Sequence, residues 1–284
     1  MGVIKWVILT LLVPVSVQAV MPVGTQCSQD PDCLFYMDFK EGQGTVTRDQ
    51  SRNSLNGTLN GGPLWLSGRT SYTNWGKRRF VVSLDSDSYC PMSGAYLYFS
   101  GTGGENVKTP VTSVFDFSVA GKKAFMIMTV IKLVTPDGDN NGFFNWTQGA
   151  NLCGWSVQKE ANTFNMQFML DVPVSGPTVY YWRNTAAAKM TFTDMRPHSL
   201  GIWCNGAGTV DMYYDGKFIN RNTGMTDVVT CGGGSALAFS EKHDSGANSN
   251  HNQGATQIWG VAIATEQASG FFKAWHEYQF GAGN

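Results

Sequence analysis

Hydrophobic and polar residues alternate along much of the chain with a period of two, the pattern of half-buried β-strands. The clearest example is His198–Ile219, in which two alternating runs flank the turn Asn205–Gly208. Asp215 and Gly216 then form a second turn, because both residue types accept the positive φ of a type I′ hairpin loop. The stretch therefore predicts two successive antiparallel hairpins with one buried face.

The same reasoning assigns most of the remaining sequence to strands. Ala124–Val134 is a long apolar run whose β-branched residues favour a central strand buried on both faces. Ser67–Lys77 reads as a loop, whereas the apolar residues of Glu266–Phe280 fall near helical spacing and predict a short C-terminal helix. Further strands are expected at Cys33–Lys40, Arg79–Leu84, Ala95–Phe99, Phe143–Trp146, Trp155–Gln158, Phe164–Leu170, Thr178–Arg183, Ser235–Ser240 and Thr256–Thr265.

Composition agrees with a protein made of many short strands. The chain has 284 residues, of which 33 are glycine, and 13% are aromatic. Only 14% of the residues are charged, against about 25% in an average protein, and the formal net charge is −1. We therefore expect no cationic surface for nucleic acid. No internal repeat or linker divides the chain, so residues 20–284 are expected to form a single domain.

Residues 1–19 differ from the rest of the chain. Lys5 is followed by the apolar run Trp6–Val13 and by the small-residue end Val17-Gln18-Ala19. This order is typical of a secretory signal peptide, and the run is shorter than the roughly 20 residues of a membrane span. An uncleaved N-terminal anchor is the alternative. We expect a secreted, extracellular or surface-associated protein with no membrane span after signal removal.

Six cysteines agree with an oxidising compartment, where such residues form disulfides. Cys27 and Cys33 are close in sequence and flank an Asp-Pro pair, which favours a small closed loop. Cys204 ends a predicted strand and Cys231 follows the next strand region, which favours a second pair. The expected disulfides are Cys27–Cys33, Cys204–Cys231 and, by elimination, Cys90–Cys153.

Catalytic motifs are missing from the sequence. Glycosidases need two carboxylates that flank the scissile bond, and no glutamate here shares a strand with a second carboxylate at alternating spacing. The nucleophile elbow, the zinc-protease motif and the phosphate-binding loop are also absent. The histidines lack the spacing of metal ligands. We therefore expect no catalytic residues and no enzyme activity.

One loop has the spacing of a calcium site. Asp137, Asp139 and Asn141 occupy relative positions 1, 3 and 5, and Gly142 occupies position 6. Position 12 is Gln148 and not the usual bidentate glutamate, and the predicted flanks are strands, so an EF-hand is excluded. The alternative is a hairpin turn, in which these residue types are common for backbone reasons. Calcium bound by these three residues is the one cofactor that the sequence suggests.

Aromatic residues are the candidates for ligand contacts, because exposed rings stack on the apolar faces of sugars. Most aromatic residues of a β-sandwich lie in its core, so we expect ligand contacts only from aromatic residues near strand ends or at outward positions. Asn56 and Asn145 begin Asn-x-Thr sequons, which are glycosylation sites if the host is a eukaryote. A glycan on Asn145 would make its neighbour less suitable as a ligand contact. The selected residues are Trp146, Tyr180, Tyr181, Trp182 and Trp203.

A family resemblance rests on the order of several short motifs. They are Asp38-Phe39, Glu41-Gly42-Gln43-Gly44, Asp49-x-Ser51, Asn56-Gly57-Thr58-Leu59, Trp65, the hairpin His198–Ile219 and the closing strand Gln257–Ala264. Together they resemble laminin-G-like, concanavalin A-like jelly rolls over nearly the whole chain after residue 19. The cysteine set and the loop Glu241–Gln253 depart from that pattern. The resemblance implies two stacked antiparallel sheets with a concave face and a loop rim that bind carbohydrate or protein, often with calcium, and it suggests Asp38 and Asp49 as a second calcium site.

These observations predict an all-β, antiparallel two-sheet jelly-roll sandwich of the concanavalin A-like type with a short C-terminal helix. The expected function is a secreted, non-catalytic binding domain that recognises a glycan or a cell-surface or extracellular protein. The alternative is a structural or adhesive component of a surface layer or virion that associates with copies of itself. A polysaccharide-active enzyme with an unfamiliar site is the third hypothesis.

Overall fold

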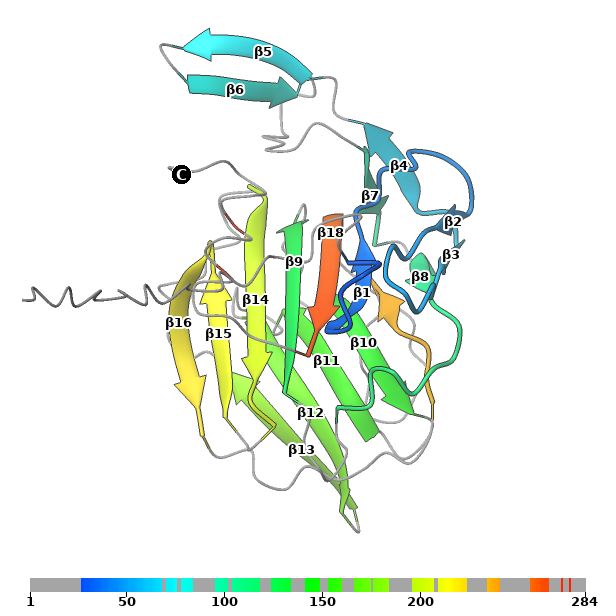
Figure 1. Cartoon of the computed structure of the whole chain (residues 1–284), viewed down its shortest axis with the longest axis vertical. Helices are drawn as coiled ribbons and strands as arrows, with labels where there is room; N and C mark the ends of the chain where they lie inside the picture. Colours follow the sequence, from blue (N-terminus) through cyan, green and yellow to red (C-terminus); the bar gives the residue numbers. More distant parts are fainter. Residues whose placement is uncertain are drawn as a thin grey trace, which may run out of the picture.

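The chain folds almost entirely into β-structure (Figure 1). The computed structural model describes residues 27–67, 70–75, 78–83, 95–101, 104–117, 124–133, 141–148, 153–159, 166–174, 176–183, 196–206, 209–223, 234–240, 256–265, 272 and 276. These residues form two antiparallel sheets of eight strands each and one two-stranded hairpin, so the predicted all-β class is confirmed. In this part of the chain, no helix has the length and apolar character needed to cross a membrane.

Sheet A contains the hairpins that the alternating pattern predicted. Its order is β16-β15-β14-β9-β18-β7-β4, with β1 paired to β18. The central strand β18 is buried at every position, because it lies between β9 and β7 and is covered on both faces. The strands are β1 (Cys33–Met37), β4 (Leu64–Ser67), β7 (Ala95–Phe99), β9 (Phe125–Leu133), β14 (His198–Cys204), β15 (Val210–Tyr214), β16 (Lys217–Asn222) and β18 (Thr256–Ala264).

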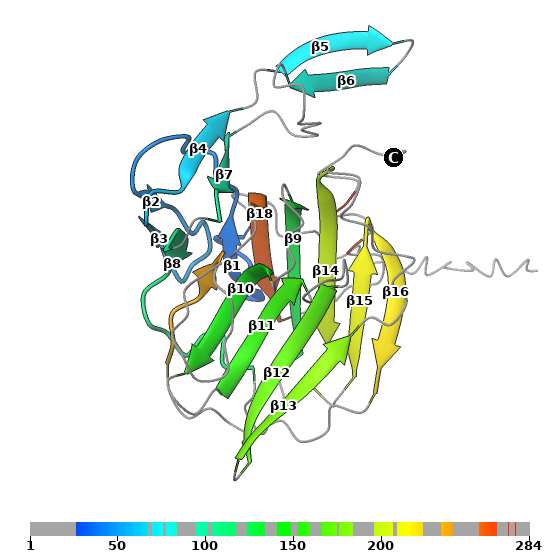
Figure 2. The ribbon, with the colours of Figure 1, turned by 180° about the vertical axis from the view of Figure 1, so that it is seen from behind.

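Sheet B faces sheet A (Figure 2). Its order is β13-β12-β11-β10-β17-β8-β3-β2, and its strands β10 to β13 follow one another as a meander. The strands are β2 (Val46–Thr47), β3 (Gly57–Asn60), β8 (Asn106–Lys108), β10 (Asn141–Gln148), β11 (Cys153–Lys159), β12 (Met166–Val174), β13 (Gly176–Arg183) and β17 (Ala238–Phe239).

The main hydrophobic core lies between the two sheets. Ile127 and Ile202 contribute to it from sheet A, and Phe144 and Trp155 contribute from sheet B. The indole nitrogen of Trp155 donates a hydrogen bond of 2.9 Å to the carbonyl of Phe115, so this buried polar group is satisfied. The inner face of each sheet is defined as the one that meets this core, and the outer face is the opposite one.

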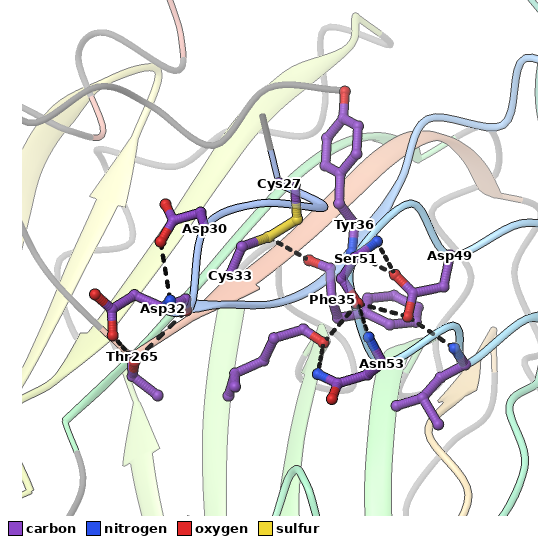
Figure 3. The surroundings of a disulfide bond; sticks show 12 residues. Cys27, Asp30, Asp32, Cys33, Phe35, Tyr36, Asp49, Ser51, Asn53 and Thr265 are labelled. Carbon is purple, nitrogen blue, oxygen red and sulfur yellow. Dashed lines mark hydrogen bonds between the residues drawn. A yellow bond between two sulfur atoms is a disulfide. The ribbon is translucent and has the colours of Figure 1, made fainter. Parts of the chain in front are cut away.

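The disulfide Cys27–Cys33 closes a loop on the outer face of sheet A, as the sequence predicted (Figure 3). Both cysteines are fully buried against residues of β9 and β18. The same loop is tied to the end of β18, because the hydroxyl of Thr265 donates to the Asp32 carboxylate at 2.9 Å. The N-terminal loop therefore covers the middle of this outer face.

Asp49 organises the turn that follows β1 (Figure 3). Its carboxylate accepts hydrogen bonds from the backbone N–H groups of Tyr36 and Leu55 and from both the N–H and the hydroxyl of Ser51, at 2.8–3.0 Å. Four donors occupy the lone pairs that a calcium ion would need. Asp38 meanwhile pairs with Lys40 at 2.9 Å. These contacts give both aspartates structural roles in the fold, and calcium binding at Asp38 and Asp49 stays a prediction.

The tight turn after β15 also agrees with its sequence. Asp215 and Gly216 have φ values of 49° and 71°, the left-handed conformation that a type I′ turn requires. The segment Ser67–Lys77, in contrast, was predicted to be a loop, yet β5 (Thr70–Trp75) pairs with β6 (Arg78–Ser83) in a hairpin. Its threonines, Tyr72 and Trp75 favour extended backbone, and this preference outweighs the polar residues between them.

Candidate ligand-binding surface

Strand alternation places one group of side chains on the outer face of sheet A at its β16 edge. Leu200 and Ile202 of β14 and Met212 of β15 point into the main core, so the residues between them point outward. The register sets Tyr213 opposite Phe218, and Asp211 opposite Arg221. We call these four residues, Asp211, Tyr213, Phe218 and Arg221, the β15–β16 surface.

Phe218 is the exposed ring of this surface. Its side chain is 53% exposed, and it is the only aromatic residue in the exposed class among the side chains that the structure describes. The ring packs edge-on against half-buried Tyr213, with centroids 5.7 Å apart and an interplanar angle of 72°. The Phe218 ring is therefore held in place while a large part of it remains open to solvent.

Arg221 and Asp211 form an ion pair beside this ring. The arginine Nε and one Nη each donate to a different carboxylate oxygen at 2.7 Å, so the pair is bidentate. The side chain of Asp211 is only 2% exposed, whereas that of Arg221 is 55% exposed. The Asp211 hydrogen bonds raise the pKa of the Arg221 guanidinium, which lies 6.0 Å from the centre of the Phe218 ring.

The C-terminal segment covers the neighbouring part of the outer face. Phe272 stacks on Tyr213 with centroids 4.1 Å apart and lies directly over Gly201, where a Cβ atom would clash with the ring. Phe272 and His276 have helical backbone. The residues between them lie outside the described part of the chain, so the short C-terminal helix remains a prediction.

A Ser-His-Asp cluster at the end of β14 was not predicted, because its members are far apart in sequence. His276 Nδ1 lies 2.9 Å from the hydroxyl of Ser199 and 3.9 Å from the carboxylate of Asp215. A hydrolytic triad uses different imidazole nitrogens for serine and aspartate, whereas one nitrogen here faces both. Ser199 is also 2% exposed. His198 binds the same aspartate at 2.9 Å, so the cluster anchors the C-terminal segment.

Two of the predicted ligand contacts, Trp203 and Trp146, differ in where they lie in the sandwich. Trp203 lies on the outer face of sheet A, half-buried against the group that contains Cys27 and Phe272, and its role as a ligand contact stays a prediction. Trp146 is fully buried, and its indole nitrogen donates to the carbonyls of Thr112 and Ser235 at 3.2 and 3.0 Å. Trp146 was predicted to contact ligand, and this is wrong, because a core ring offers no face to a sugar.

The other three predicted aromatic contacts lie on β13, the edge strand of sheet B. Tyr180 and Trp182 pair with Leu170 and Phe168 of β12, which in turn pair with Trp155 and Val157 of β11. Tyr181 takes the alternate position. Side-chain contacts of these residues lie outside the description, so their roles in binding remain predictions.

The calcium loop is not tested by the structure. Asp137 and Asp139 lie outside the described residues, and Asn141 is described only through its backbone at the start of β10. Elsewhere in the described ranges, no three His, Cys, Asp or Glu side chains converge as metal ligands would. Calcium binding at Asp137, Asp139 and Asn141 therefore stays a prediction.

The second predicted disulfide is not formed in the structure. Cys204 is a free thiol buried in the main core, and burial raises the pKa of this thiol. Its side chain points inward with those of Leu200 and Ile202. Cys231, Cys90 and the Cys153 side chain lie outside the description, so the pair Cys90–Cys153 stays a prediction.

The two predicted glycosylation sites differ in exposure. Asn56 is exposed, and its side-chain oxygen accepts a hydrogen bond of 3.0 Å from the N–H of Asp49. This hydrogen bond uses the side-chain oxygen of Asn56 and not the amide nitrogen, which is the atom that carries a glycan. Asn145 is half-buried, and its side-chain oxygen is enclosed. Asn56 is therefore the more accessible acceptor.

Comparisons with known proteins identify the fold but not a family. No family model and no curated protein matches the chain. Among solved structures, the binding domain of Paraclostridial Mosquitocidal Protein 1 is similar with a TM-score of 0.61 and 11% identity, over 87% of this chain and 52% of that one. The botulinum neurotoxin serotype D binding domain has a TM-score of 0.56 and 12% identity, over 87% and 52%.

A third similar structure is the binding domain of botulinum neurotoxin DC in complex with SialylT, with a TM-score of 0.54 and 13% identity over 88% of this chain and 52% of that one. The chain thus spans about half the length of the solved chains it matches. At these identities the likeness concerns the fold. The chain is an all-β protein whose two antiparallel sheets are arranged as in the binding domains of these toxins, and the laminin-G-like relationship suggested by its motifs is not established.

Proposed function

We propose that this protein is a secreted, non-catalytic binding domain with a jelly-roll sandwich, and that it recognises a glycan through the β15–β16 surface. The observation that carries the proposal is the exposed ring of Phe218 beside the bidentate Arg221–Asp211 pair. Secretion is supported by the signal-like residues 1–19 and by the disulfide Cys27–Cys33.

The chemistry of this surface suits a sugar. A pyranose has an apolar face of C–H groups that packs on an aromatic ring, and its rim of hydroxyls needs fixed hydrogen-bond partners. Phe218 supplies the ring, and Arg221 keeps N–H donors that Asp211 does not use. Tyr213 and Asp211 hold these two side chains in place before any ligand arrives, which reduces the entropy lost on binding.

The similar proteins support binding as the general function. Among similar solved structures, one botulinum neurotoxin DC binding domain holds SialylT and another holds rat synaptotagmin II, and cell entry of botulinum neurotoxin type C is described as dependent on interaction with two ganglioside molecules. Binding domains of this fold therefore take both glycans and proteins. For the present chain, the ring-and-arginine arrangement favours the glycan, and a protein ligand is the alternative that the experiment must separate.

A glycan array tests this proposal directly. The secreted protein, the Phe218→Ala variant and the Leu64→Ala variant are applied with and without calcium. Leu64 is a matched control, because its side chain is also 53% exposed but it lies on β4, at the other end of sheet A. We expect wild type and Leu64→Ala to bind the same glycans, and Phe218→Ala to lose about tenfold or more in affinity.

Two results of the array would count against the proposal. Absence of binding to any glycan, with or without calcium, rejects glycan recognition and directs attention to a protein ligand. Equal binding by wild type and Phe218→Ala retains glycan recognition but rejects this surface as its site. A requirement for calcium would support a metal site such as the Asp137 loop, which the proposal does not need.

A further inference from the structure

We infer that the β15–β16 surface selects uncharged glycans over sialylated or sulfated ones. This inference rests on the proposed function and concerns the class of ligand at the same site. It comes from the charge balance of the surface, where the one cation, Arg221, is already neutralised by a carboxylate. Phe218 and Tyr213 add no charge at neutral pH.

Asp211 cannot leave this pair for solvent. It lies on β15 between Trp203 of β14 and Arg221 of β16, and its side chain is almost completely buried. Both of its oxygens accept a hydrogen bond from Arg221, at 2.7 Å each. A buried carboxylate that loses its partner is strongly destabilising.

An anionic sugar can therefore bind here in two arrangements, and both are energetically unfavourable. If Arg221 turned toward the ligand, Asp211 would be left buried and unpaired. If Arg221 kept its position, the anion would approach an ion pair with no net charge. Its electrostatic attraction to this pair would then be too weak to offset the cost of removing water from the anion. Neither arrangement rewards a negative charge on the ligand.

An uncharged sugar hydroxyl can bind Arg221 without either of these costs. The bidentate contact uses the Nε hydrogen and one hydrogen of Nη2, which leaves three N–H donors of the guanidinium. A sugar hydroxyl oxygen can accept from these donors without moving Arg221 away from Asp211. Stacking on Phe218 likewise depends on the apolar face of the sugar and not on its charge.

The remaining charged groups nearby do not change this balance. Asp215, at the turn after β15, is bound by His198 and by the N–H of Ser199. Lys217 is exposed at the start of β16, opposite Tyr214, which belongs to the inner-face series. On the described outer face, no second cation joins Arg221 to receive an anion.

The experiment compares matched glycans that differ only in a terminal sialic acid or a sulfate. Binding is measured by titration for wild type, Asp211→Asn, Phe218→Ala and, as a charge-matched control away from the surface, Asp116→Asn. We expect wild type and the control to bind the uncharged member about threefold more tightly or better. Asp211→Asn frees the charge of Arg221, so its preference should shift toward the anionic member while Phe218→Ala weakens both.

Three results are decisive. Tighter binding of the anionic members by wild type overturns the inference but leaves the proposed function intact if Phe218→Ala still weakens both. An Asp211→Asn variant that is folded, as judged by thermal unfolding, and keeps the wild-type preference also overturns it. Failure of wild type to bind any member rejects the proposed function itself. If Asp211→Asn does not fold, the wild-type comparison alone decides.

Discussion

At the scale of single residues, buried aspartates are fixed by several hydrogen bonds at once. Asp49 accepts four hydrogen bonds in the turn after β1, and Asp211 accepts two from Arg221. The Asp-x-Ser motif around Asp49 was visible in the sequence, but its donors come from both sides of the motif. The sequence spacing of such a motif therefore does not show whether its carboxylate binds a metal ion or backbone N–H groups.

Replacing Asp49 by alanine is expected to lower the free energy of unfolding by about 3 kcal/mol, because buried N–H groups of Tyr36 and Ser51 would lose their acceptor. Urea denaturation measures this change. Arg52→Ala, at an exposed position of the same turn, serves as the control and should change stability by less than about 0.5 kcal/mol. A calcium-dependent stability of the wild type that Asp49→Ala abolishes would contradict the structural role.

Cys204 gives the protein a pH-dependent stability at alkaline pH. Burial raises the pKa of its thiol above the value in the unfolded chain, which is about 8.5. Below about pH 8.5 both states keep the thiol protonated. As pH rises above that value, the unfolded chain ionises first, so the contribution to stability is lost.

The difference in unfolding free energy between wild type and Cys204→Ala should therefore be constant below about pH 8.5 and should fall from there upward. Denaturant titrations at several pH values measure it. A difference that stays constant across the alkaline range would mean that Cys204 does not titrate, as in a disulfide with Cys231.

At the scale of elements, the β14–β15 hairpin and the C-terminal segment form one unit. Gly201 provides the space into which Phe272 fits, and Ser199 binds His276 two strand positions away. The alternation within His198–Ile219 predicted the hairpin because that signal is local, whereas the Ser199–His276 contact spans 77 residues of sequence and left no local trace.

Gly201→Ala should lower stability by about 2 kcal/mol, because a Cβ would clash with the ring of Phe272. The double variant Gly201→Ala/Phe272→Ala removes that clash, so its destabilisation should be less than the sum of the two single effects. A double-mutant cycle by thermal or urea unfolding measures this coupling. Strictly additive effects would show that Phe272 does not pack on Gly201 in solution.

At the scale of the whole molecule, the sequence predicted the fold class more reliably than it predicted which side chains are exposed. Period-two patterns identify strands, yet they do not say which face meets the opposite sheet. Trp146 was therefore assigned to a ligand surface although it lies in the core, and Phe218, which followed a turn and carried no motif, was missed. An aromatic residue two positions after the Asp215-Gly216 turn, on the last strand of a hairpin, was the signal that could have indicated an exposed edge.

The central claim is that ligand binds at the β15–β16 surface, and hydrogen–deuterium exchange with and without a glycan selected on the array tests it most directly. The account predicts that the glycan slows exchange in β15 and β16, Val210–Tyr214 and Lys217–Asn222, and leaves β10 to β13 of sheet B unchanged. Protection confined to sheet B, with β15 and β16 unaffected, would contradict it.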